Sequence, residues 1–158
     1  MSYKLIDLHS KEKTLVDRES SKYWNDETLE KNKAFNVIDL GFDKIEASDK
    51  YKALLDSMIQ INHKHGIKIK NAKILSIASG SCWVESQLFK DSHFKSLTNV
   101  DISQHRIHKL APFTMDHYGV HGDVSFLHGS VFDMDVLEGE FDIILMSQAF
   151  HHMEEPRS

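Results

Sequence analysis

From about residue 70 onward, the chain alternates short apolar runs with segments of helical periodicity. The apolar runs predict four buried strands, at residues 73–78, 97–101, 124–127 and 141–146. Helices are expected over 82–90 and from Ser103 to Gly119, and Pro112 should kink or break the second of these. Strands that alternate with helices at this spacing favour a parallel α/β sheet with right-handed crossovers.

The N-terminal part of the chain is more polar and is expected to be helical. Asp26 is a candidate N-cap for a helix over 27–38, and Ser48 is one for a second helix that ends near Gly66. Helical spacing predicts that one face of the second helix is buried. The residues of that face are Tyr51, Leu54, Leu55, Met58 and either Asn62 or Ile61.

The composition is that of one ordinary globular domain, and it narrows the range of functions. The chain has 158 residues, of which 41% are hydrophobic and 27% are charged. Its net charge of −5 argues against sequence-independent binding of nucleic acid. No apolar run is long enough for a membrane span, and the N-terminus lacks the apolar stretch of a secretory signal. The single cysteine, Cys82, excludes an internal disulfide and favours a reducing, cytoplasmic location.

The turn after the first predicted strand is the most informative segment for function. Residues 74–86 read ILSIASGSCWVES, so a buried strand ends in small residues and a helix opens at once. Small residues let the backbone approach a ligand closely, and a helix N-terminus offers free N–H groups to a carboxylate or phosphate. Taken alone, this segment fits any strand–helix turn of an α/β protein equally well.

An acidic residue ends the next predicted strand. Asp101 follows Gly80 by 21 residues, and a carboxylate at that place can accept hydrogen bonds from ribose hydroxyls. The alternative is that Asp101 only serves the N-terminus of the following helix. A dinucleotide fingerprint needs glycines where this chain has Ala78, Gly80 and Trp83, and the tryptophan fits NAD poorly. A tighter spacing gives Ala78, Gly80 and Cys82, which are all small.

Four segments, in order over residues 73–153, resemble class I S-adenosylmethionine-dependent methyltransferases of the small-molecule type. These segments are KILSIASGSCWVE, NVDIS, FLHGSVFDMDV and FDIILMSQAFHHMEE. The resemblance implies a Rossmann-like, mostly parallel sheet with strand order 3-2-1-4, an incomplete version of the family's seven-stranded fold. It also implies two parts, an N-terminal helical cap or lid over residues 1–70 and a cofactor-binding half over residues 71–158.

The resemblance further implies a cofactor and the residues around it. The cofactor would be S-adenosylmethionine, with S-adenosylhomocysteine as its product. Ala78, Ser79 and Gly80 would line the methionine end of the cofactor. Asp101 would bind the ribose, and Ile102 would lie against the adenine. The adenine edge would be formed by Gly129, Ser130 and Val131, and the residue beside the sulfonium would be Gln148.

The reaction expected from this resemblance is in-line transfer of the activated methyl group to a small-molecule acceptor. His151 and His152, just beyond the cofactor loop, are the candidate general bases. His9 and Tyr23 are alternatives, because in many relatives the N-terminal segment folds over the cofactor. No metal is expected, since the histidine pairs have neither an H-E-x-x-H motif nor a cysteine partner.

The chain departs from the family pattern in its motif residues and in its length. The family usually has an acid at the place of Ser76, glycine at Ala78 and Cys82, and aspartate at Ser130. The sequence stops after the fourth predicted strand, and a hydrophobic edge strand of this kind should not stay bare. We therefore expect one of two explanations. Either the rest of the sheet is missing, through truncation or proteolysis, or a second copy or a partner chain covers the edge.

Two alternative functions stay open on the sequence alone. The first is a non-catalytic binding module, an incomplete or degenerate methyltransferase-like domain that works through a partner chain. The second is an NAD-dependent oxidoreductase, against which Trp83 argues. Titration with S-adenosylhomocysteine and with NADH separates these alternatives from a methyltransferase.

Overall fold

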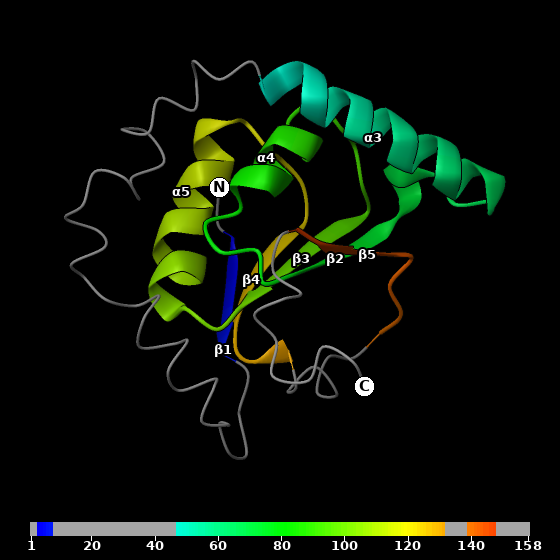
Figure 1. Cartoon of the computed structure of the whole chain (residues 1–158). Helices are drawn as coiled ribbons and strands as arrows, with labels where there is room; N and C mark the ends of the chain where they lie inside the picture. The colour runs from blue at the N-terminus through cyan, green and yellow to red at the C-terminus, as the bar shows by residue number, and fades with distance from the viewer. Residues whose placement is uncertain (1–2, 8–46, 132–138, 148–158) are drawn as a thin grey trace.

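A five-stranded sheet forms the centre of the protein (Figure 1). The computed structural model describes residues 3–7, 47–131 and 139–147. The strands have the spatial order β1-β4-β3-β2-β5, and each runs parallel to its neighbours. Their bounds are β1 Lys4–Asp7, β2 Lys73–Ile77, β3 Ser96–Asp101, β4 Val124–His128 and β5 Ile143–Met146.

The four strands predicted from the sequence all form, and they form in the predicted order. β4, β3, β2 and β5 are the predicted strands three, two, one and four, so the order 3-2-1-4 is confirmed. β1 is an addition to which the sequence analysis assigned no strand. It pairs with the outer side of β4, with Lys4 opposite Ser125 and Asp7 opposite His128. Sequence periodicity missed β1 because a run of four residues is too short to distinguish a strand from a loop.

Helices cover one face of the sheet (Figure 1). On this face, Ile74 of β2 and Leu97 of β3 belong to one apolar core with Phe89 of α4. The neighbouring strand positions Leu75 and Val100 belong to a second cluster, on the opposite face, because successive side chains of a strand alternate between faces. The bounds of the helices are α3 Ala47–Lys64, α4 Trp83–Phe89, η4 Arg106–Leu110 and α5 Ala111–His117, with a short 3-10 turn, η3, at Ile69–Asn71.

The helix predicted after β3 is interrupted at Pro112, as expected. The residues before it form η4, a π-helical segment, and α5 begins at Ala111 with Pro112 in its first turn. Proline has no N–H to donate, and a widened turn lets the helical path continue past the missing hydrogen bond. Gly119 ends the helix with a φ of +69°, a conformation that favours glycine.

α3 confirms the second predicted helix but not all of its predicted buried face. Gly66, with a φ of +76°, follows the helix and supplies the predicted stop. Leu55 packs against the core, whereas Leu54 is 43% exposed, so the prediction that Leu54 is buried is wrong. Of the two alternatives at the end of the helix, Asn62 is half-buried and Ile61 is exposed. α3 contacts the core along a narrower stripe than its apolar pattern suggests.

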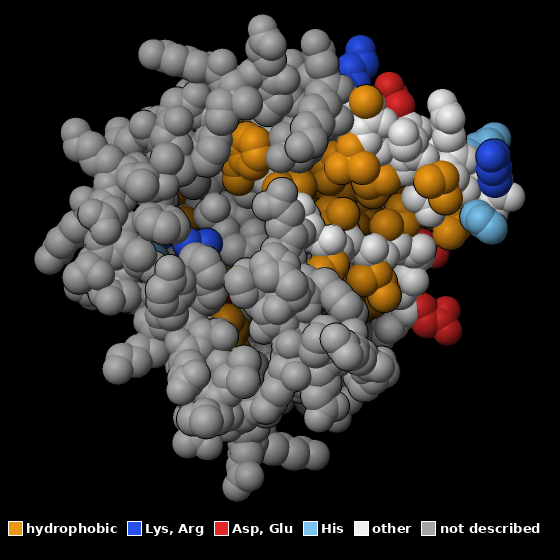
Figure 2. Space-filling view, viewed as in Figure 1, with side chains coloured by type: hydrophobic (Ala, Val, Ile, Leu, Met, Phe, Trp, Pro, Cys, Tyr) orange, Lys and Arg blue, Asp and Glu red, His pale blue; other side chains and the backbone are white. Residues whose placement is uncertain are grey.

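Hydrophobic side chains gather over α3 and the strands beside it (Figure 2). The large exposed ones on α3 and β5 are Leu54, Ile59, Ile61 and Ile144. An exposed apolar surface of this kind is typical of a place where another chain or segment packs. Within the described ranges, no helix is both long enough and apolar enough to cross a membrane.

Candidate functional site

The loop that follows β2, residues 78–82, turns sharply at the carboxyl end of the sheet; we call it the β2 loop. Ala78, Gly80 and Cys82 have φ angles of 53°, 55° and 58°, so all three are left-handed. A non-glycine residue in this conformation costs roughly 1–2 kcal/mol. Cys82 N–H donates to Ser79 O at 2.8 Å, and Ser79 N–H donates to Val100 O at 3.2 Å. The backbone therefore keeps a path suited to glycine at Ala78 and Cys82, although both carry side chains.

Asp101, at the end of β3, is bonded directly to the β2 loop. Its Oδ2 accepts the Gly80 N–H at 2.8 Å, and its Oδ1 accepts the Ser103 N–H at 2.8 Å. Burial raises the pKa of Asp101, while these two hydrogen bonds and the nearby charges of Arg106 and His128 act to lower it. The structure thus brings together the loop and the acid that the sequence analysis singled out. Each carboxylate oxygen retains a second lone pair for a further donor.

The end of β4 lies next to the same acid. Gly129 N–H donates to the backbone oxygen of Asp101 at 3.0 Å, and the following Ser130 is buried. Val131 packs against the apolar cluster on the face opposite the helices, and Ile102 is half-buried directly after Asp101. These residues, which the resemblance placed around an adenine, therefore lie at the same end of the sheet as the β2 loop.

A buried pair of polar side chains joins the strand before the β2 loop to the helix after it. Ser76 Oγ donates to Glu85 Oε1 at 2.6 Å, and both side chains are buried. Burial raises the pKa of Glu85 to about 7, although the Ser76 hydrogen bond acts to lower it. Sequence reasoning missed Glu85 because a glutamate in a helix is usually exposed. The available signal was Ser76, which stands where the family usually has an acid.

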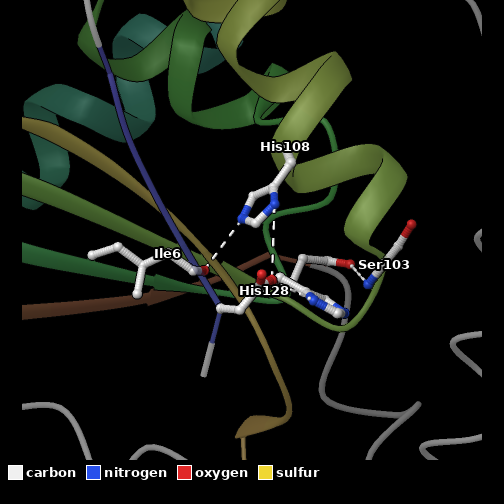
Figure 3. A network of polar contacts seen from close by, with 6 residues as sticks. Ile6, Ser103, His108 and His128 are labelled. Atoms are coloured by element: carbon white, nitrogen blue, oxygen red, sulfur yellow. Dashed lines mark hydrogen bonds and ion pairs between the residues drawn. The ribbon is translucent and has the colours of Figure 1, made fainter. Parts of the chain in front are cut away.

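Polar contacts also tie β1 to β4 and to η4 (Figure 3). His128 Nδ1 lies 2.8 Å from Asp7 Oδ1, and His108 Nε2 lies 3.2 Å from Ile6 O. His108 Nδ1 is 3.9 Å from the same Asp7 oxygen. Ser103 Oγ accepts the backbone N–H of the first residue of η4 at 3.2 Å, which confirms Ser103 as the predicted cap. His128, which pairs with Asp101 in the sheet, is thus held on its other side by Asp7 of β1.

Cys82 and the histidines add no further reactive centre that the structure describes. Cys82 is fully buried, and burial raises the pKa of its thiol well above its ordinary value, which suits packing rather than nucleophilic attack. Within residues 3–7, 47–131 and 139–147, no group of three or more His, Cys, Asp or Glu side chains is arranged to hold a metal ion. The predictions that lie outside the described residues are the helix over 27–38, the side chain of Tyr51, and His9, Tyr23, Gln148, His151 and His152.

The site lies within a segment that matches a known protein family. The family model described as "Methyltransferase domain" matches residues 75–158, more than half of the chain. The chain belongs to the methyltransferase domain family. The resemblance seen in the sequence is therefore confirmed, and the NAD-dependent oxidoreductase has no support from the match. A comparison with curated proteins gives no match.

Solved structures, two methyltransferases among them, share the fold. The plantazolicin methyltransferase BamL, solved with a triazolic desmethylPZN analog and SAH, is 17% identical with a TM-score of 0.57, covering 89% of this chain and 48% of that one. The magnesium protoporphyrin IX methyltransferase of Synechocystis PCC 6803, solved with SAM, is 14% identical with a TM-score of 0.57, covering 93% and 69%. YcgJ from Bacillus subtilis is 21% identical with a TM-score of 0.50, covering 63% and 39%. The chain thus spans less than half the length of YcgJ and of BamL.

Proposed function

We propose that this chain binds S-adenosylmethionine at the carboxyl ends of β2, β3 and β4 and belongs to an enzyme that transfers its methyl group to a small molecule. The observation that carries this proposal is the 2.8 Å hydrogen bond from Gly80 N–H to the Asp101 carboxylate. It joins the β2 loop to the acid at the carboxyl ends of β2 and β3, and an adenosine ligand would need both. The family match supports the same reaction class.

The residues present fit such a ligand. Ser79 Oγ is buried in the β2 loop, where the Cys82 thiol, a weak hydrogen-bonding group, is the side chain that interacts with it. The methionine end of the ligand offers stronger polar partners for this hydroxyl. At Gly80, an added Cβ would lie in ordinary contact with Arg106 Nη1, at 3.4 Å, so the φ of +55° rather than lack of space favours glycine here. Asp101 is available for the ribose hydroxyls through its second lone pairs.

The chain's own residues would then have separate roles. Ala78, Ser79 and Gly80 would line the methionine end, and Asp101 would hold the ribose while Ile102 contacts the adenine. The bound cofactor supplies an activated methyl group on a sulfonium, so the protein mainly has to align the acceptor and exclude water. The other residues proposed to contact the cofactor are Gly129, Ser130, Val131 and Gln148.

The proposal also covers the methyl acceptor, the cellular location and the association of the chain. A small molecule is favoured over nucleic acid because the chain carries a net charge of −5. His151 or His152 would accept a proton where the acceptor has to lose one. The single cysteine supports a cytoplasmic location. The exposed edge of β5, with Ile144 63% exposed, supports a second copy or a partner chain at that edge.

Calorimetric titration of the 158-residue chain with S-adenosylhomocysteine and S-adenosylmethionine tests the proposal. We expect both to bind with ordinary stoichiometry, Asp101→Ala to weaken both, and the exposed control Asp56→Ala to weaken neither. Absence of binding by a folded protein would sink the proposal. Binding followed by no methyl transfer to any of a panel of small O, N, S and C nucleophiles would favour the non-catalytic binding module instead.

A further inference from the structure

Glu85 is a buried charged group that the proposed function does not use. The residue is 2% exposed. Its Oε1 accepts a hydrogen bond from the Ser76 hydroxyl at 2.6 Å. Among the described residues, no lysine, arginine or histidine forms an ion pair with it. Burying a carboxylate without a cation costs stability, and a neutral side chain of the same size would avoid that cost. A ligand that carries a positive charge would offset this cost by interacting with the carboxylate.

The position of Glu85 connects it to the candidate site from two sides. Ser76 precedes the β2 loop by two residues and Glu85 follows the loop by three, so their hydrogen bond closes the loop at its base. The charge of Glu85 also acts on Cys82 inside the loop, and the charge of Asp101, which binds Gly80, acts on Glu85. Two buried carboxyl groups therefore flank one loop.

The two forms of the cofactor differ in charge. S-adenosylmethionine carries a sulfonium, so it has one positive charge more than S-adenosylhomocysteine, which has a neutral thioether. A fixed negative charge in a low-dielectric site stabilises the first relative to the second. A carboxylate at the base of the loop with no ion pair among the described residues would therefore favour the methyl donor over the spent product.

We propose that Glu85, held by Ser76, is a positioning residue whose negative charge makes the β2 loop prefer the cationic methyl donor over its neutral product. This inference rests on the proposed function. The titratable and charged groups around Glu85 are Cys82 in the loop and Asp101 at the end of β3, with Arg106 and His128 next to Asp101. The elements packed on the other sides of α4 contribute apolar side chains, among them Leu55 of α3 and Met115 of α5.

The first test measures the affinities of both ligands for Glu85→Gln by calorimetry at pH 8. At an effective dielectric constant of about 20, one unit charge changes the affinity for a cation bound near it by about tenfold. We therefore expect Glu85→Gln to weaken S-adenosylmethionine by about that factor and S-adenosylhomocysteine by less than about twofold. The matched control is Glu140→Gln, an exposed glutamate in the turn that leads into β5, at the opposite end of the sheet. It should change neither affinity.

A second variant tests the idea if Glu85→Gln does not fold. The Ser76 hydrogen bond lowers the pKa of Glu85, so Ser76→Ala should raise that pKa. In the parent protein the preference for the donor should increase as pH rises through about 7, and in Ser76→Ala the same increase should occur at higher pH. Proton release on binding the donor, and none on binding the product, is the accompanying calorimetric signature.

The outcomes separate the two proposals. Equal loss of both ligands in Glu85→Gln, or no loss of either, would overturn the role of Glu85 and leave the proposed function standing. An unchanged pH profile in Ser76→Ala would overturn it as well. Failure of the parent protein to bind either ligand would overturn the proposed function, and this inference with it. Selective loss of the donor supports the inference.

Discussion

The two inner strands that carry the site and the two outer strands of the sheet differ in what they expose. In β2 and β3 every side chain is buried or half-buried, the acidic Asp101 at the end of β3 included. In β1 all four residues are exposed, and in β5 Ile144 is 63% exposed. The inner pair is thus enclosed by its own chain. Within the described ranges, no strand pairs with the outer edges of β1 and β5, so these strands present apolar side chains and backbone groups there.

The inner and the outer strands contain different kinds of destabilising feature. Beside the inner strands, the buried Glu85 carboxyl group and the left-handed Ala78 and Cys82 each lower stability, and all three lie in the β2 loop or at its base. At the outer strands the unfavourable feature is exposed apolar surface, which another chain could remove. The first kind of cost points to ligand binding and the second to association.

The largest effect is expected at the inner strands, from Asp101→Ala. This change removes the acceptor of two backbone N–H groups, those of Gly80 and Ser103. We expect the free energy of unfolding to fall by about 2–5 kcal/mol and the free energy of cofactor binding to weaken by about 1–3 kcal/mol. Urea unfolding and calorimetry measure the two effects. Asp56→Ala, on the exposed side of α3, should change neither, and unchanged binding in Asp101→Ala would mean that the ribose assignment is wrong.

The second prediction concerns the pH dependence of stability. The pKa of Glu85 is about 7 in the fold, above its ordinary value of 4.5, so the folded state holds the proton more tightly. Its contribution to stability is therefore fully present below about pH 4.5 and is lost as pH rises to about 7, by about 3 kcal/mol in total. Glu85→Gln should remove this decline. Urea unfolding between pH 4.5 and 8 checks it, and parallel curves for parent and variant would contradict it.

These inner residues also show how far sequence reasoning reaches. The four strands, the β2 loop and Asp101 followed from apolar periodicity and motif spacing, because each involves a long run or a fixed distance along the chain. The order of the four strands followed from the resemblance to methyltransferases. Glu85 could not be found this way, since its burial depends on how α4 packs against β2. β1 could not be found either, because its pairing with β4 is decided by tertiary contacts rather than by its four residues.

At the outer strands, Ile144→Lys tests association. If a second copy covers β5, a charge on this exposed position should weaken the dimer about tenfold, or about 1.4 kcal/mol. Sedimentation velocity over a concentration series measures the change. The control is Thr98→Ser, a small change in the inner strand β3, which should leave association unchanged. A parent protein that is monomeric at all concentrations would exclude a second copy of this chain as the cover.

The smallest effect is expected from Ala78→Gly in the β2 loop. Ala78 has a φ of 53°, which glycine adopts without strain, while glycine also adds freedom to the unfolded chain. The net result should be a gain in stability of about 0.5–1 kcal/mol, measured by urea unfolding. Ala53→Gly in α3 is the matched control and should lose about 1 kcal/mol, because its residue is helical. A loss of stability in Ala78→Gly would contradict the left-handed assignment.

The pairing of β1 with β4 has a consequence for how the protein forms. Residues 4–7 lie more than a hundred residues before their partners at 125–128 in the chain. Closing so long a loop is slow, so the sheet should assemble from β2 and β3 outward and gain β1 late. An N-terminal fusion placed on this strand would then disturb the final folding step and, through Asp7 and His128, the surroundings of Asp101.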